Sequence, residues 1–175
     1  MDLDDTIYME ADYQKSGYRY LSTLVHRYFG FDLAKFESIV QTERDVLGAV
    51  ADQIGVPSLK DSLLWAYRLH EPDITLNAKV RDAINLFEKQ SAGVYILTDG
   101  RSITQRQKLR ALGLSHLTVL TSEDFGELDK MSTKRFLQIQ KLSPSDRYVY
   151  IGDNPAKDFV AANRLGWLTI GVRPS

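Results

Sequence analysis

The chain has 175 residues, 43% of them hydrophobic, which is enough for one globular core or for one core with a modest insertion. Its formal net charge of −1 gives no basic surface for nucleic acid or for an anionic membrane, so neither partner is expected. Cysteine is absent, which excludes disulfides, thiol nucleophiles and cysteine-ligated zinc.

The first six residues, Met-Asp-Leu-Asp-Asp-Thr, form an acidic segment. Asp2 and Asp4 are two residues apart, so in an extended backbone both carboxylates point to the same face. Two converging carboxylates repel each other, and a divalent cation beside them makes the pair tolerable at neutral pH. An acidic start is also the opposite of a signal peptide, and no apolar run reaches membrane-spanning length, so we predict a cytoplasmic protein.

The segment from about residue 10 to residue 72 is predicted to be helical, because its apolar residues recur at helical spacing. Gly30 ends the first helix, and Asp32 is a suitable N-cap for the second. Ser58, with Asp61 three residues on, begins the third in a capping pattern. The predicted apolar faces are Leu21, Leu24, Val25 and Tyr28 in the first helix, Phe36, Ile39, Val40 and Leu47 in the second, and Leu63, Leu64 and Tyr67 in the third.

The second half of the chain alternates between short apolar runs and helices, a pattern typical of a parallel sheet in an α/β fold. Asn77 is expected to cap the first of these helices, and Gly113 and Gly166 to end two later ones. The predicted strands are residues 93–97, 117–120, 148–152 and 168–172. The predicted helices carry Val80, Ile84 and Phe87, span about 102–112, begin near 132 and span about 156–165.

Polar residues follow three of these strands at their carboxyl ends, where parallel sheets bind ligands. The three segments are Thr98-Asp99-Gly100, Thr121-Ser122-Glu123-Asp124 and Gly152-Asp153-Asn154. Together with Asp2, Asp4 and Asp158 they offer carboxylates and a hydroxyl. This set, with a lysine, predicts a site for a hard cation beside an anchor for phosphate.

The order of these segments resembles the four motifs of the haloacid dehalogenase-like hydrolase superfamily. The motifs read DLDDT, an apolar run ending in TDG, a lysine, and an apolar run ending in GDNPAKD, and they cover residues 2–158. The resemblance implies an α/β fold with a three-layer, Rossmann-like core of residues 1–9 and 73–175. It also implies a small α-helical cap of residues 10–72, which closes over the site and selects a small soluble substrate.

The resemblance implies a role for each motif residue. Asp2 matches the family's nucleophile, which attacks phosphorus and becomes an aspartyl phosphate, and Asp4 matches the general acid and base. Thr98 matches the hydroxyl that holds the phosphoryl oxygens, with help from the backbone N–H groups of Asp99 and Gly100. Lys130 matches the lysine by its spacing, although methionine follows it where family members often have proline.

The same resemblance implies Mg²⁺ as the cofactor. Asp2, Asp153 and the main-chain carbonyl of Asp4 match its ligands, and Asp158 matches the second acid that orients the site. The ion and Lys130 would neutralise the repulsion between a phosphoryl group and a carboxylate. Dehalogenases of the superfamily lack an acidic residue at the position of Asp4, so the implied substrate is a small phosphomonoester such as a sugar phosphate or a nucleoside monophosphate.

Three other functions stay open: a phosphomutase, a receiver-like phosphorylatable module, and a catalytically impaired binding or scaffold protein of the same fold. The N-terminus favours the impaired binding or scaffold protein, because the family has an apolar core strand before the first motif and this strand is missing here. Three explanations of the missing strand are open. Met1 is an internal methionine of a longer chain, which we favour, or another segment or a neighbouring chain fills the gap. In the third, the N-terminus is mobile and the protein is inactive. The sequence does not predict the oligomeric state.

Overall fold

The computed structural model describes residues 1–126 and 129–173, and the chain divides into two compact units. One unit, here called the core unit, consists of Met1–Glu10 and Ile74–Ser175. The other, here called the helical unit, consists of Ala11–Asp73. No helix in the described part of the chain is long and apolar enough to cross a membrane.

The helical unit contains four helices within its described residues, and its predicted helical character is confirmed. They are α1 (Glu10–Phe29), whose first residue belongs to the core unit, α2 (Leu33–Thr42), α3 (Val46–Ile54) and α4 (Leu59–Leu69). Asp32 caps α2 by accepting a hydrogen bond from the Lys35 N–H at 2.8 Å, as predicted. The buried side chains at the centre of this unit are Leu21, Val25, Phe31, Phe36, Ile39, Val46, Val50 and Leu63.

Three details of the helical prediction are wrong. Leu47 belongs to α3 and not to the second helix, because Asp45 starts a new helix by accepting from the Gly48 N–H at 3.1 Å. Ser58 precedes α4 but makes no capping hydrogen bond with its side chain. Tyr28 is 70% exposed, because it lies in the last turn of α1, beyond the last buried side chain of that helix, Val25.

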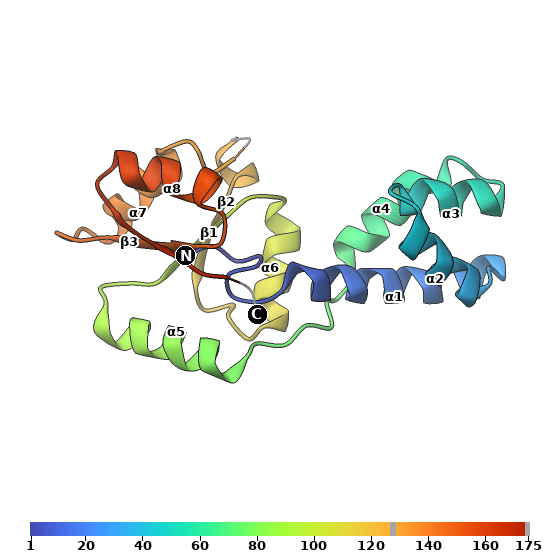
Figure 1. Ribbon diagram of the computed structural model, residues 1–175, viewed down its shortest axis with the longest axis horizontal. Coiled ribbons are helices and arrows are strands. Elements are labelled where there is room, and N and C mark those ends of the chain that lie inside the picture. The colour runs from blue at the N-terminus through green and yellow to red at the C-terminus, as the bar shows by residue number, and fades with distance from the viewer. Residues whose placement is uncertain (127–128, 174–175) are drawn as a thin grey trace. The chain divides into compact units, whose positions relative to one another are not determined.

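The core unit alternates strands and helices in the predicted order (Figure 1). Its helices are α5 (Ala78–Gln90), α6 (Ser102–Ala111), α7 (Lys134–Leu142) and α8 (Pro155–Arg164), and a short 3-10 turn η1 (Glu123–Phe125) follows the second strand. Its strands are β1 (Tyr95–Thr98), β2 (Thr118–Thr121), β3 (Val149–Gly152) and β4 (Leu168–Gly171). The prediction of an α/β fold is confirmed.

The strands are parallel, as predicted, but they form two separate pairs. β1 pairs with β2, with Ile96 opposite Val119, and β3 pairs with β4, with Tyr150 opposite Thr169. In Figure 1, α7 and α8 lie above the strands and α5 lies below them, which gives the predicted three layers. One cluster of buried side chains in the core unit consists of Leu97, Leu120, Phe136, Ile139, Tyr150, Ala161, Ala162 and Trp167.

Met1 and Asp2 lie between the two pairs of strands and are hydrogen-bonded to both. The Met1 amino group donates to the Tyr95 carbonyl at 2.7 Å, and the Leu97 N–H donates to the Met1 carbonyl at 2.9 Å. On the other side, the Asp2 N–H donates to the Ile151 carbonyl at 2.8 Å. The sheet is therefore interrupted between β1 and β3, at the place where the family has one more strand. Met1 and Asp2 bridge the two strand pairs near the carboxyl ends of β1 and β3.

Candidate active site

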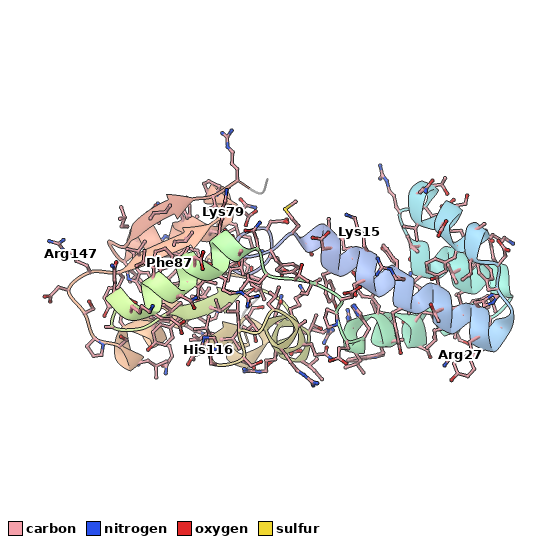
Figure 2. The ribbon with its side chains drawn as sticks, turned by 90° about the horizontal axis from the view of Figure 1, so that it is seen from below. Lys15, Arg27, Lys79, Phe87, His116 and Arg147 are labelled. Carbon is pink, nitrogen blue, oxygen red and sulfur yellow. The ribbon has the colours of Figure 1, made fainter. Side chains whose placement is uncertain are left out.

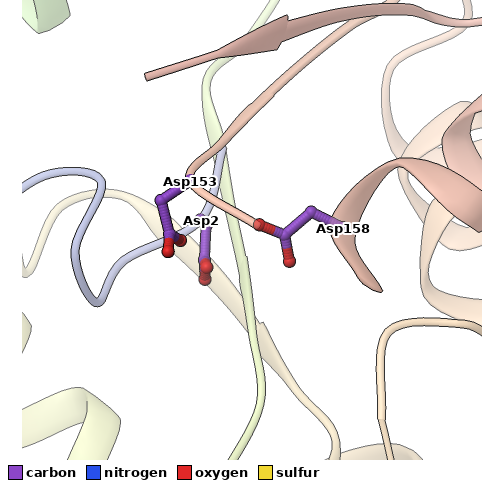
Figure 3. A group of neighbouring side chains, drawn as sticks. All are labelled: Asp2, Asp153 and Asp158. Carbon is purple, nitrogen blue, oxygen red and sulfur yellow. The ribbon is translucent and has the colours of Figure 1, made fainter. Parts of the chain in front are cut away.

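Three carboxylates meet at the carboxyl ends of the strands of the core unit. Oxygen atoms of Asp2, Asp153 and Asp158 all lie within 4.8 Å of one another (Figure 3). Asp2 follows from the hydrogen-bonded N-terminus, Asp153 comes directly after β3, and Asp158 lies in the first turn of α8. Gly152 permits this approach, because a Cβ atom at that position would clash with the Asp158 carboxylate.

Lys130 lies between two of these carboxylates. Its Nζ is 2.5 Å from Oδ2 of Asp2 and 2.7 Å from Oδ1 of Asp158, and its side chain is 4% exposed. The structure thus brings together four of the residues that the sequence singles out. Lys134, the other lysine of this region, is exposed at the start of α7.

Burial controls the protonation of this cluster. Burial raises the pKa of Asp2 to about 6, against the opposing effects of Lys130 and the Leu3 N–H. Burial alone would lower the pKa of Lys130, but Asp2 and Asp158 outweigh it and raise that pKa above its usual value. Lys130 therefore stays cationic at neutral pH. Burial also lowers the pKa of the Met1 amino group to about 5, so this group is neutral at neutral pH.

The segment after β1 is held by a buried arginine that the sequence reasoning missed. Arg135 on α7 is fully buried and donates to the Thr98 carbonyl and to Oδ1 of Asp99, both at 2.8 Å. Lys157 Nζ is 2.6 Å from the other carboxylate oxygen of Asp99. Burial would raise the pKa of Asp99, but Lys157 and Arg135 outweigh it and lower the pKa.

Thr98 and Gly100 are placed where the sequence predicts a phosphate anchor, at the end of β1. Thr98 is 1% exposed. Gly100 has φ +112, a conformation that favours glycine, and its N–H donates to Ser122 Oγ at 2.9 Å. In this structure the predicted phosphate-binding N–H of Gly100 is thus hydrogen-bonded to a serine at the end of β2.

The Asp4 side chain makes a second polar cluster instead of joining the three carboxylates. Lys108 Nζ on α6 is 2.7 Å from Oδ1 of Asp4, and Gln105 Nε2 is 3.2 Å from Oδ2. The Tyr8 hydroxyl donates a short hydrogen bond to Oδ1 as well. Sequence reasoning missed Lys108, Gln105 and Tyr8. Gln105 and Lys108 are three residues apart in the predicted 102–112 helix, a spacing that puts both on one face, but this pattern also occurs on solvated helices.

A model of the haloacid dehalogenase-like hydrolase (HAD) family matches residues 1–172. This chain belongs to that family. The resemblance that the four motifs carry is thereby confirmed.

Solved structures of HAD proteins match nearly the whole chain. One of them is the magnesium-bound HAD-hydrolase YfnB from Bacillus subtilis, whose crystal structure reveals interdomain movement. It is 25% identical to this chain, with a TM-score of 0.65. The match covers 98% of this chain and 86% of YfnB. A haloacid dehalogenase-like family hydrolase from Xanthomonas campestris is 18% identical with a TM-score of 0.60, covering 99% and 79% of the two chains. The second match shows the fold alone.

One curated relative carries a named activity. The glyceraldehyde 3-phosphate phosphatase of Methanopyrus kandleri is 34% identical over 82 residues, which are 44% of this chain. The match spans only 34% of the length of that relative.

Replacing Lys130 by methionine is expected to lower the free energy of unfolding by about 3 kcal/mol or more, because it leaves two buried carboxylates without their cation. Urea unfolding at neutral pH, followed by circular dichroism, measures the loss. Lys134→Met is the matched control, since Lys134 is exposed on the following helix, and it should change the free energy by less than about 0.5 kcal/mol. Equal unfolding midpoints for the two variants would show that Lys130 is not needed to neutralise the cluster.

Proposed function

We propose that this HAD hydrolase is a Mg²⁺-dependent phosphatase that hydrolyses a small phosphomonoester through an aspartyl phosphate on Asp2. The observation that carries the proposal is the placement of Asp2 beside Lys130, Asp153 and Asp158 at the strand ends. The phosphatase activity of the Methanopyrus kandleri relative supports it, and so does the magnesium in the YfnB structure. The predicted cytoplasmic location stays a prediction.

The Asp2 carboxylate is oriented by two contacts, as a nucleophile requires. The Leu3 N–H donates to its Oδ1 at 2.7 Å, and Lys130 contacts its Oδ2 at 2.5 Å. Backbone hydrogen bonds to β1 and β3 fix the residue itself. This arrangement reduces the entropy that an in-line attack on phosphorus would otherwise cost.

The donor set fits a hard divalent cation. Asp2, Asp153 and Asp158 provide carboxylate oxygens within 4.8 Å of one another, and Lys130 supplies only one compensating positive charge within the contacts described. Asp2 and Asp153 would hold the ion, with the main-chain carbonyl of Asp4. A bound Mg²⁺ would neutralise negative charge and so reduce the repulsion between a phosphoryl group and the carboxylate.

The remaining residues would bind phosphate and move a proton. Lys130 would neutralise a phosphoryl oxygen, and the Thr98 hydroxyl with the N–H groups of Asp99 and Gly100 would hold the other oxygens. Asp4 would protonate the leaving alcohol and later accept a proton from water. Gly100 would have to exchange its hydrogen bond with Ser122 for one with the phosphate.

The helical unit is the proposed cap. Caps of this kind close over a substrate, exclude water and select for size, which restricts the substrate to a small molecule. The interdomain movement of YfnB supports this role for residues 10–72. Sugar phosphates and nucleoside monophosphates are the proposed substrate class, and glyceraldehyde 3-phosphate joins the panel because of the Methanopyrus kandleri relative.

Asp2→Asn is expected to reduce phosphate release from the best substrate of this panel to the background rate, because an amide cannot form the acyl phosphate. Phosphate release in the presence of Mg²⁺ measures it, with Lys134→Met as the active control. The melting temperature of the Asp2→Asn variant should not fall, because an amide oxygen can still accept from the Leu3 N–H. No turnover of any phosphomonoester by the unsubstituted protein would favour the scaffold alternative.

Lys108→Met is expected to lower kcat about tenfold to a hundredfold with little change in KM, because Asp4 loses the charged partner that positions it. Steady-state kinetics on the same substrate separates the two constants. Lys108→Arg should recover part of kcat, and Arg110→Met, at an exposed position of the same helix, should leave it unchanged. A rise in KM alone would place Lys108 in substrate binding instead.

Magnesium affinity is expected to fall as the pH drops below about 6. The pKa of Asp2 is raised, so below pH 6 the folded protein holds a proton on Asp2 that the ion must displace. Above pH 6 the carboxylate is already free and the affinity should level off. Isothermal titration calorimetry should show an approximately tenfold weaker binding per pH unit from 6 downward, with proton release. A flat affinity between pH 5 and pH 8 would contradict the assignment of Asp2 as a ligand.

A further inference from the structure

The peptide group between Asp99 and Gly100 is hydrogen-bonded on both sides by side chains that have no role in the proposed reaction. Its N–H, on Gly100, donates to Ser122 Oγ at 2.9 Å, and its carbonyl, on Asp99, accepts from Gln105 Nε2 at 2.6 Å. Ser122 directly follows β2, and Gln105 lies on α6, the pale yellow helix in Figure 2. Both side chains are buried. Because a planar trans peptide directs its N–H and its carbonyl in opposite directions, the two side chains hold the same orientation of one peptide.

This orientation directs the Gly100 N–H away from the edge of β1 where Asp2 lies. Strand β2 pairs with one edge of β1, and Met1, followed by Asp2, pairs with the other edge. The Gly100 N–H donates to Ser122, on the β2 edge. An N–H proposed to hold a phosphoryl group on Asp2 therefore faces the opposite edge of the strand.

The other side of this peptide engages a second proposed phosphate donor. The Thr98 hydroxyl donates to the Asp99 carbonyl at 3.4 Å. Gln105 Nε2, which holds the same carbonyl, also donates to Asp4 Oδ2 at 3.2 Å. Asp4 is the proposed acid for the leaving alcohol, so this side of the peptide is the one that a phosphoryl group would approach. A carbonyl oxygen repels a phosphoryl oxygen, whereas an N–H group binds it.

Glycine at position 100 permits a rotation of this peptide. A planar peptide rotates as one unit, and half a turn changes the φ of the following residue by about the same angle. Gly100 has φ +112, and glycine adopts positive and negative φ about equally readily, so both orientations are open to it. The flanks are fixed, because Arg135 binds the Asp99 carboxylate. On the other flank, the Ser102 N–H donates to Glu123 at 2.8 Å, so the rotation is confined to this short segment.

We propose that the Asp99–Gly100 peptide turns when phosphate binds, and that Ser122 and Gln105 are positioning residues that oppose this turn. The turn exchanges the bond between the N–H and Ser122 for a bond to phosphate, and it releases the Thr98 hydroxyl from the carbonyl. The two residues thereby set how tightly the site holds phosphate. Gln105 also links the turn to Asp4. The inference rests on the proposed phosphatase function.

Phosphate affinity tests the opposition to the turn. Ser122→Ala is expected to bind inorganic phosphate about threefold to tenfold more tightly than the unsubstituted protein, because the N–H then has one hydrogen bond fewer to give up. Gln105→Met is expected to tighten binding similarly, because the carbonyl loses its donor. Isothermal titration calorimetry in the presence of Mg²⁺ measures the affinities, and Ser38→Ala, at an exposed position of α2, is the control. A side chain that only supported the loop would weaken phosphate binding when replaced.

Isotope labelling follows this peptide alone. Asp-Gly occurs once in the sequence, so ¹³C at the aspartate carbonyl and ¹⁵N in glycine together mark only the peptide between Asp99 and Gly100. Adding phosphate with Mg²⁺ should shift both of its resonances, beyond any effect of Mg²⁺ alone. At saturating phosphate, the Gly100 resonances of the unsubstituted protein and of Ser122→Ala should nearly coincide, because the turned peptide no longer contacts Ser122.

Equal or weaker phosphate binding by Ser122→Ala or by Gln105→Met would overturn the inference. So would a Gly100 resonance that phosphate does not shift, and this arm needs only the unsubstituted protein, so it holds even where a variant does not fold. In each of these cases, turnover of a phosphomonoester by the unsubstituted protein would leave the proposed function standing. No phosphate binding and no turnover by the unsubstituted protein would overturn the inference and the proposed function together.

Discussion

The buried contact of Lys130 with Asp2 and Asp158 is the interaction on which the candidate site depends. Both carboxylates and the lysine are almost wholly buried, so none of them can be stabilised by water. Bringing Asp2 to this position without Lys130 would leave carboxylates close together in a poorly solvated place, where repulsion and desolvation add. The same neutralised cluster is what an incoming phosphoryl group needs. One lysine therefore meets the requirement for folding and the requirement of the proposed chemistry.

The backbone position of Asp2 is the second constraint, and it comes from an interrupted sheet. Here Met1 and Asp2 take the place of the end of a strand and pair with β1 and β3. The Tyr150 hydroxyl adds a further link from β3 to the Leu97 carbonyl of β1 at 3.0 Å. The proposed nucleophile is positioned by these few contacts.

The sequence predicts most of the secondary structure and the carboxylate–lysine cluster, because strand ends and motif order carry those features. It places Asp2, Lys130, Asp153 and Asp158 together before any contact is known. It does not find Arg135 or Lys108, because a charged residue in a helix has the same local pattern whether it faces solvent or a buried carboxylate. It also places Leu47 in the wrong helix. A new helix begins after the N-cap Asp45, but the helical spacing of the apolar residues does not show this break.

The two acidic residues of the first motif end in different environments, and this difference suits different tasks. The Asp2 side chain is 8% exposed and contacts a buried lysine, while the Asp4 side chain is 22% exposed and is shared among Lys108, Gln105 and Tyr8. A nucleophile must keep one fixed orientation, whereas an acid–base group must exchange protons with alcohol and water. Asp4 can exchange one of several partners without leaving a buried charge unpaired, and Asp2 cannot. Two carboxylates that are two residues apart in the sequence therefore lie in separate clusters and are chemically distinct.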